Sequence, residues 1–342
     1  MTDLTTAPRH ENPARPGPDA LVSLRGVSKH YPVRGTGRGA AHRRVLRAVD
    51  DVSLDVRRGE TLGVVGESGS GKSTLGRLAV RLIDATTGSV RFDGQEIAGL
   101  PASRLRPVRR HMQVVFQDPL GSLDPRMSIG QIVAEPLRVL DGARGAALTD
   151  RVAELLELVG LDPARSGASP RALSGGQRQR VGIARAIAVN PRFILADEPV
   201  SALDVSVQAQ ITNLLVELQE RLGLTYLFIG HGLPVVRQIS QRVAVMYLGR
   251  VVEIGDVDAV FGAPMHPYTR ALISVSPEAD PDAPHRERIV LRGEQPSPVD
   301  LPSGCRFRTR CPIAQEICAV VAPPRLDVGA AHSAECHFPA QR

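Results

Sequence analysis

Short apolar runs alternate along this chain with longer stretches in which apolar residues recur every three or four positions. Four of the short runs have the composition of buried strands: residues 61–65, 112–116, 193–196 and 224–229. Residues 207–222 form one helical stripe, and the pattern of residues 128–189 is largely helical. Strands that alternate with helices predict an α/β fold with a parallel sheet core. The long helical stretch predicts a subdomain inserted into that core.

Other segments indicate antiparallel pairing. Residues 22–33 and 49–58 resemble two long strands separated by a polar loop, and residues 89–93 alternate like a third strand that closes on the turn signal Asp93-Gly94. Residues 242–248 and 251–254 flank Gly249-Arg250 as a hairpin. The sequence therefore predicts an antiparallel β subdomain beside the parallel core.

Composition shifts divide the 342 residues into three parts. Residues 1–20 combine prolines and polar residues without an apolar segment, which predicts a disordered tail rather than a signal peptide. Residues 21–276 hold the strand and helix pattern. Residues 277–342 begin with closely spaced prolines and hold all the cysteines, so we expect a linker into a small C-terminal module.

Overall composition sets limits on function. A hydrophobic content of 42% and a charged content of 23% are typical of a globular protein, and no stretch approaches the roughly 18–20 apolar residues of a membrane span. The net charge of +6 fits either nucleic acid or an anionic membrane surface. Aromatic residues make up only 3%, and no basic-aromatic platform for bases is visible, so we expect no nucleic-acid partner.

A glycine-rich loop follows the apolar run at residues 61–65. Its sequence fits G-x-x-x-x-G-K-S and precedes a helical pattern, so backbone amides and a helix N-terminus would converge on one anion. Lys72 would reach the β- and γ-phosphates of a nucleotide, and the Ser73 hydroxyl would bind Mg²⁺. Lys72 is one of only two lysines in the chain. The predicted phosphate-binding residues are Gly66, Ser68, Gly69, Ser70, Gly71, Lys72, Ser73 and Thr74.

Two carboxylates end the buried strand at residues 193–196. Asp197 would hold the Mg²⁺ shell, and Glu198, one residue further, would polarise the attacking water as a general base. In isolation, the same pair is also a common acidic turn after a strand. The phosphate loop makes the catalytic interpretation the stronger one.

A second glycine-containing helix start lies about 100 residues further along. Ser174 suits an N-cap, and Gly175 and Gly176 would leave backbone amides accessible before a helix that includes Val181 and Ile183. Two phosphate-binding helix N-termini this far apart in sequence can serve one nucleotide only if they face each other.

These residues resemble the ATP-binding cassette family. Ser174-Gly175-Gly176-Gln177 matches its signature motif, which in that family covers the ATP held by another subunit. The resemblance spans roughly Leu21 to Leu291 and includes four further positions. By this likeness they are the adenine-stacking Tyr31, the Mg²⁺-sensing Gln117, the interface-loop Asp204 and the switch histidine His231, which contacts the γ-phosphate. The family usually has an aspartate directly after the switch histidine, whereas this chain has Gly232.

A finer resemblance concerns the solute. Residues 122–127, 200–206 and 266–272 and the tail from Pro302 to Pro312 look like those of ATPase subunits of oligopeptide/dipeptide importers. That group also contains nickel importers, so another small solute is the alternative. The resemblance implies ATP and Mg²⁺ as cofactors, with Mg²⁺ held by Ser73, Gln117 and Asp197.

The same likeness implies a set of partners. They are two transmembrane permease subunits, a second ATPase subunit, and indirectly an extracytoplasmic solute-binding protein, which places the chain peripherally on the cytoplasmic face of the membrane.

Two other functions compete with transport. A soluble cassette ATPase usually carries tandem cassettes or coiled-coil insertions, and neither occurs here. A nucleotide-binding regulator that does not hydrolyse ATP would have a damaged set of catalytic residues, whereas Glu198 is present in this chain.

The four cysteines, Cys305, Cys311, Cys318 and Cys336, all lie in the last 38 residues. Their spacing lacks the C-x2-C pairs of zinc ribbons, yet four thiolates tolerate irregular spacing around an iron–sulfur cluster. Some relatives in the importer family carry a [4Fe-4S] cluster here. The sequence leaves three readings open: such a cluster, zinc, or cysteines that act as small packing residues.

Overall fold

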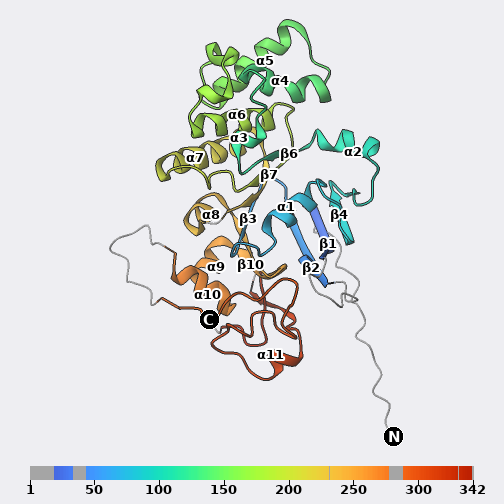
Figure 1. Cartoon of the computed structure of the whole chain (residues 1–342), viewed down its shortest axis with the longest axis vertical. Helices are drawn as coiled ribbons and strands as arrows, with labels where there is room; N and C mark the ends of the chain where they lie inside the picture. Colours follow the sequence, from blue (N-terminus) through green and yellow to red (C-terminus); the bar gives the residue numbers. More distant parts are fainter. Residues whose placement is uncertain (1–18, 34–43, 231, 277–287, 330, 341–342) are drawn as a thin grey trace, which may run out of the picture.

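The computed structural model describes residues 19–33, 44–230, 232–276, 288–329 and 331–340. Residues 1–18 of the tail predicted at residues 1–20 and the switch residue His231 lie outside these ranges, and β1 begins at Ala20. Figure 1 shows an elongated molecule with helices α4, α5 and α6 at one end of the long axis and the C-terminal extension with α11 at the other. The strands labelled in Figure 1 lie between these two ends.

The central sheet has eight strands in the order β11-β12-β10-β9-β3-β8-β7-β6. Five adjacent strands, β9, β3, β8, β7 and β6, run parallel to one another. The strands β10, β12 and β11 extend the sheet beyond β9 by antiparallel pairing. Every residue of β3, β7, β8 and β9 is buried, as expected for strands covered on both faces. The strands are β3 (Thr61–Val65), β6 (Met112–Val115), β7 (Phe193–Asp197), β8 (Thr225–Ile229), β9 (Arg242–Tyr247), β10 (Arg250–Asp256), β11 (Arg325–Gly329) and β12 (His332–Glu335).

A second sheet of four antiparallel strands has the order β2-β1-β4-β5. The strands are β1 (Ala20–Val33), β2 (Arg44–Arg57), β4 (Thr87–Phe92) and β5 (Gln95–Glu96). The tight turn between β4 and β5 places Asp93 and Gly94 at φ values of 51° and 76°, which suits the Asp-Gly pair. The predicted α/β fold with an antiparallel β subdomain is confirmed.

Helices cover the sheets and build the inserted subdomain. That subdomain consists of α4, α5 and α6 with two 3-10 turns, η1 (Pro163–Gly167) and η2 (Pro170–Ala172), within the predicted range of residues 128–189. The apolar pattern did not reveal α2, α8, α9 or α10, which are short. The helices are α1 (Lys72–Ala79), α2 (Ala102–Arg109), α3 (Pro119–Ser122), α4 (Ile129–Leu140), α5 (Gly145–Leu158), α6 (Gly175–Ile187), α7 (Val205–Leu222), α8 (Leu233–Ile239), α9 (Val257–Gly262), α10 (Pro267–Ser274) and α11 (Ile317–Val320).

The C-terminal extension is joined to the main sheet, because β12 pairs with β10. Glu253 of β10, with no exposed surface, fixes this junction: its carboxylate accepts hydrogen bonds at 2.8 Å from the amides of Met265 and His266 and contacts His332 Nε2 at 2.8 Å. A buried carboxylate needs such partners to offset its desolvation. The predicted boundary near residue 277 stays a prediction, but the described part of the extension packs on the cassette.

None of the helices in the described part of the chain combines the length and apolar character that crossing a membrane requires.

Candidate nucleotide site

The phosphate loop connects β3 to α1, as the sequence predicts. Gly66 and Gly71 adopt φ values of 150° and 103°. A Cβ atom at Gly66 would lie 2.2 Å from the Met246 carbonyl oxygen, and one at Gly71 would lie 2.1 Å from the Ala48 carbonyl oxygen. Both positions therefore require glycine for conformation and for close backbone approach. Gly71 also begins α1 without a side-chain cap, so no side chain occupies the helix N-terminus.

Lys72 is buried within this loop, with 4% of its surface exposed. Its Nζ donates to the carbonyl oxygens of Gly66 at 2.8 Å and Glu67 at 3.0 Å. Burial lowers the pKa of Lys72, whereas the nearby carboxylates of Glu198, Asp197 and Glu67 act in the opposite direction. The ammonium thus lies where it can contact both loop carbonyls and an incoming anion.

A cavity of about 390 Å³ opens on this loop. It brings together the predicted Tyr31, the phosphate loop and Glu198, which lie far apart in sequence. Tyr31 is 37% exposed, and Lys29 Nζ lies 5.0 Å from its ring centroid. Three of the lining residues, Leu46, Ala48 and Pro298, belong to no motif in the sequence that indicates a nucleotide site. The full lining is Tyr31, Leu46, Ala48, Ser68, Gly69, Gly71, Lys72, Ser73, Thr74, Glu198 and Pro298.

A larger cavity of about 880 Å³ lies between β2, β10 and the extension. Its arginines already have acidic partners, such as Arg306 with Asp50 and Arg250 with Glu335. It also lacks a glycine loop at a helix N-terminus. We therefore assign the nucleotide to the smaller cavity, where the chemistry for phosphate binding is present.

Two carboxylates at the end of β7 face the phosphate loop. Asp197 is 2% exposed, its Oδ2 lies 3.5 Å from Arg77 Nη2, and its buried Oδ1 has no hydrogen-bond partner among the described residues. Glu198 is 6% exposed and adopts φ 51°, with its amide donating to the Ile229 carbonyl at 3.0 Å. A left-handed glutamate costs on the order of 1 kcal/mol, and such strain often marks functional positions. A buried carboxylate oxygen that has no hydrogen-bond partner among the described residues suits the oxygen-ligand chemistry of Mg²⁺, although Asp197 itself does not line the cavity.

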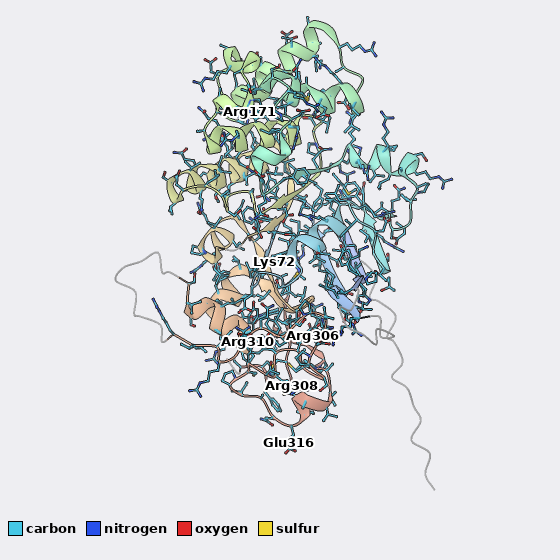
Figure 2. All side chains as sticks on the ribbon, in the orientation of Figure 1. Lys72, Arg171, Arg306, Arg308, Arg310 and Glu316 are labelled. Carbon is cyan, nitrogen blue, oxygen red and sulfur yellow. The ribbon has the colours of Figure 1, made fainter. Side chains whose placement is uncertain are left out.

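Ser174 begins α6 with a capping box. The Gln177 amide donates to Ser174 Oγ at 3.3 Å, and the Ser174 amide donates to Gln177 Oε1 at 3.1 Å. The glycines have a packing role that the sequence did not reveal: a Cβ atom at Gly176 would lie 2.6 Å from Val207 Cγ1 of α7. Ser174 is exposed and does not line the cavity. Figure 2 shows Arg171, three residues before Ser174, far from Lys72.

Comparison with known proteins agrees with this geometry. Residues 49–201 match the model of the ABC transporter family, and residues 252–318 match the C-terminal region of oligopeptide/dipeptide transporters. A peptide import ATP-binding protein of Brucella ovis is 51% identical over 316 residues, which is 92% of this chain and 97% of the relative. The chain belongs to the ABC transporter family.

Further comparisons support the same assignment to the ABC family. The oligopeptide transport ATP-binding protein AppF of Bacillus subtilis is 49% identical over 324 residues, or 94% of this chain and 98% of AppF. Among solved structures, the dimeric post-hydrolysis state of the ATP-binding cassette MJ0796 bound to ADP and Pi is 33% identical with a TM-score of 0.62. That match covers 69% of this chain and 99% of the cassette.

Two of the remaining ABC positions, Gln117 and Asp204, are exposed. Gln117 is exposed just after β6 and does not line the cavity. Asp204 is exposed and caps α7, accepting from the Val207 amide at 3.0 Å, a hydrogen bond that lowers its pKa. His231 lies outside the described residues. Its neighbour Gly232 is the N-cap of α8 and has no side-chain hydrogen bond there.

The four cysteines are reduced, and two of them, Cys318 and Cys336, are buried. Within the described ranges, no three His, Cys, Asp or Glu side chains are grouped to hold a metal ion, so the predicted four-cysteine metal site is not supported in this arrangement. Burial raises the pKa of Cys305, Cys311 and Cys336, the last to about 11, which favours neutral thiols. In this arrangement the cysteines act as small packing residues.

Proposed function

We propose that this chain is the ATP-hydrolysing subunit of an ABC importer for oligopeptides or dipeptides. One observation carries the enzymatic part: a single cavity brings the phosphate loop and Glu198 together. The peptide part rests on the match of residues 252–318 to the oligopeptide/dipeptide transporter region and on relatives named as peptide import proteins.

Phosphate binding is assigned to the loop from Gly66 to Thr74. Its backbone amides and the N-terminus of α1 would bind the β- and γ-phosphates. Lys72 Nζ, which donates to the carbonyl oxygens of Gly66 and Glu67, would donate to phosphate oxygens instead when the nucleotide is bound. Tyr31, at the open side of the cavity, would stack on adenine. Ser73, Asp197 and Gln117 would hold Mg²⁺, which neutralises charge that develops on the phosphates.

Glu198 is the proposed general base. Its position in the cavity wall, beside Lys72, places a carboxylate where it can orient and deprotonate a water molecule that attacks the γ-phosphate. His231 would contact the same phosphate. The left-handed backbone of Glu198 supports this role, because it turns the chain at the point where β7 ends.

The signature residues Ser174, Gly175, Gly176 and Gln177 would act on ATP bound by a second ATPase subunit, either identical or homologous. The exposure of Ser174 and the absence of all four residues from the chain's own cavity support this assignment. Asp204 caps α7 beside them, since Gly176 packs on Val207 of the same helix. Closure of the two subunits on ATP would bring the N-terminus of α6 to the partner's phosphates.

A groove next to the Gln117 segment is the proposed contact with a permease subunit. It has a volume of about 340 Å³ and is lined by α2, β6, α4 and neighbouring residues. Leu82, Phe116 and Val139 expose 45%, 37% and 55% of their surfaces there. An apolar groove with Arg109, Glu135 and Arg185 at its wall suits a short amphipathic helix of a membrane subunit. This contact would hold the chain on the cytoplasmic face of the membrane, with a solute-binding protein on the other side.

The experiment is Glu198→Gln. We expect it to retain ATP affinity and to lose turnover by about 10²- to 10⁴-fold, because it removes the base and leaves the phosphate loop intact. Glu217→Gln, on the exposed side of α7, is the matched control and should hydrolyse ATP like the parent. Hydrolysis by purified Glu198→Gln at the parental rate would show that the base is another group.

The solute is tested separately, because nickel or another small solute would use the same ATPase machinery. Uptake of labelled peptides and of nickel by cells carrying the transporter distinguishes these two options. ATP turnover without any membrane partner in pull-down experiments would favour the alternative of a soluble, non-transport ABC ATPase.

The finer cofactor proposal is a [4Fe-4S] cluster on the four cysteines. What supports it is that all four cysteines lie in the extension, where the Cys305 amide donates to the Cys318 carbonyl at 2.8 Å. In the described arrangement they are not grouped for a metal ion, so binding would require their loops to move. Iron and sulfide near four each per chain after anaerobic purification would support the cluster. Their absence would leave the cysteines as packing residues.

A further inference from the structure

The C-terminal extension reaches the phosphate loop through Arg310. Its Nη1 donates to Glu67 Oε2 at 2.8 Å, and its Nη2 donates to Glu67 Oε1 at 3.0 Å. The Arg310 side chain is 10% exposed and that of Glu67 is 25% exposed. Figure 2 shows Arg310 and Arg306 on the side of the extension that faces Lys72, with Arg308 further away. A bidentate pair of this kind fixes orientation as well as charge.

Aromatic side chains hold Arg310 in place. The guanidinium carbon lies 6.0 Å from the Tyr247 ring centroid, and Phe307 packs edge-on against Tyr247 at 5.3 Å and near Tyr268 at 5.5 Å. Tyr268, fully buried on α10, accepts a hydrogen bond from the Glu67 amide at 2.8 Å. Glu67 is therefore held at its backbone by the cassette and at its carboxylate by the extension.

Glu67 creates an electrostatic problem for a phosphate site. It is the one acidic residue among Gly66 to Ser73. It acts on Lys72 together with Glu198 and Asp197, so three carboxylates lie near the ammonium that binds phosphate. A free carboxylate in the loop would repel a triphosphate, and the low dielectric of a partly buried site would strengthen that repulsion. The guanidinium of Arg310 offsets this charge.

We propose that Arg310 is a positioning residue for the nucleotide reaction: it neutralises and orients Glu67 so that the phosphate loop accepts ATP. The C-terminal extension thus contributes to the nucleotide site without touching the nucleotide. This inference rests on the proposed role of the phosphate loop. The competing explanation is that the ion pair only fastens the extension to the cassette.

A double-mutant cycle separates these explanations. Arg310→Gln should weaken binding of Mg-ATP to the full chain at least fivefold, because it leaves the Glu67 charge uncompensated. Glu67→Gln should bind ATP at least as tightly as the parent. The combined variant should return to within twofold of the parent, because removing the carboxylate removes the repulsion. A mere fastening role predicts no such rescue.

Arg308→Gln is the matched control, since Arg308 contacts Ser303 within the extension, at 2.9 Å and 3.3 Å. It should bind ATP like the parent. The loss of ATP affinity in Arg310→Gln should also become smaller as the salt concentration is raised, because salt screens the repulsion between Glu67 and the triphosphate. Parental affinity in Arg310→Gln, or a combined variant as weak as Arg310→Gln, would overturn the proposal.

Two of the single variants keep the result interpretable. If Arg310→Gln does not fold, the ATP affinity of Glu67→Gln tests the proposal by itself. A fivefold loss of ATP affinity in Glu67→Gln would contradict the proposal. Lys72→Ala tests the proposed function independently. Parental ATP binding by Lys72→Ala would show that the assigned loop is not the phosphate site, whatever the result at Arg310.

Discussion

The N-termini of α1 and α6 look alike in sequence, since both are rich in glycine and serine, but the structure separates them. Gly71 begins α1 in a left-handed conformation without a side-chain cap, and the helix start lies in a cavity beside buried Lys72. Ser174 begins α6 with a complete capping box and is exposed at the surface. The first N-terminus opens into a cavity that also holds Lys72, whereas Ser174 is not among the residues that line that cavity.

This difference fits the proposed roles of the two helix starts toward a nucleotide. The α1 start can bind phosphate within one chain, because its amides have no capping side chain and the charge of Lys72 is close. The α6 start satisfies its own amide through Ser174, so the isolated chain gains nothing from a ligand there. Its hydroxyl can still donate to a phosphate that another subunit presents.

The largest effect is expected from Lys72→Ala, which removes the basic group at the start of α1. We expect ATP affinity to fall about 10- to 100-fold, because a charge-assisted contact to phosphate is lost in a buried site. Equilibrium dialysis with labelled ATP measures this effect. The other lysine gives the control variant, Lys29→Ala, in which a small loss of affinity would reflect its contact with Tyr31. A Lys72→Ala chain that binds ATP normally contradicts the assignment.

Acidification should weaken the support of the phosphate loop. His266 caps α10, which carries Tyr268, and burial lowers its pKa to about 4 against the opposing effect of Glu253. An unfolded histidine titrates near 6.5, so between about pH 6.5 and 4 the unfolded chain binds a proton that the folded chain excludes. The free energy of unfolding is therefore fully maintained above pH 6.5 and should fall by about 2 kcal/mol between pH 7.5 and 5.

His266→Asn is the control for this prediction, because asparagine can cap a helix but does not titrate. Urea unfolding at several pH values should show a smaller loss in this variant than in the parent. An identical pH dependence in both proteins would mean that His266 does not carry the effect.

Gly232→Asp should have the smallest effect. Gly232 is the uncapped N-cap of α8 at φ −80°, and a Cβ atom there would meet only Val235 Cγ2, at 3.8 Å. An aspartate fits this position and should stabilise the chain by a few tenths of a kcal/mol while ATPase activity is preserved or raised. Thermal unfolding and turnover measure both. Strong loss of activity would show that the glycine itself is required.

The elements around the start of α1 could be predicted from the sequence, because the information is local. A buried strand, the glycines and Lys72 follow one another, and Asp197 and Glu198 stand at the end of the buried strand β7. The α6 start was also predicted, although the packing of Gly176 on Val207 was not, because it depends on a contact between two helices.

The contribution of the extension was not predictable. The short polar strand β12 has no alternating pattern, and its burial depends on pairing with β10 and on the Glu253–His332 contact. The Arg310–Glu67 pair joins residues 243 positions apart, and neither residue belongs to a motif that signals the other. Such non-local contacts become visible only in three dimensions.

The central claim is that the α6 N-terminus acts on ATP bound by another subunit. The most direct measurement compares ATP affinity of the isolated chain and turnover of the assembled transporter for Ser174→Arg and Ser128→Arg. Ser128 caps α4 with the same kind of capping box, so both variants lose a similar cap of about 1 kcal/mol. We expect both chains to bind ATP like the parent, with turnover lost in Ser174→Arg alone. A large loss of ATP affinity in isolated Ser174→Arg would place Ser174 in the chain's own site and contradict the account.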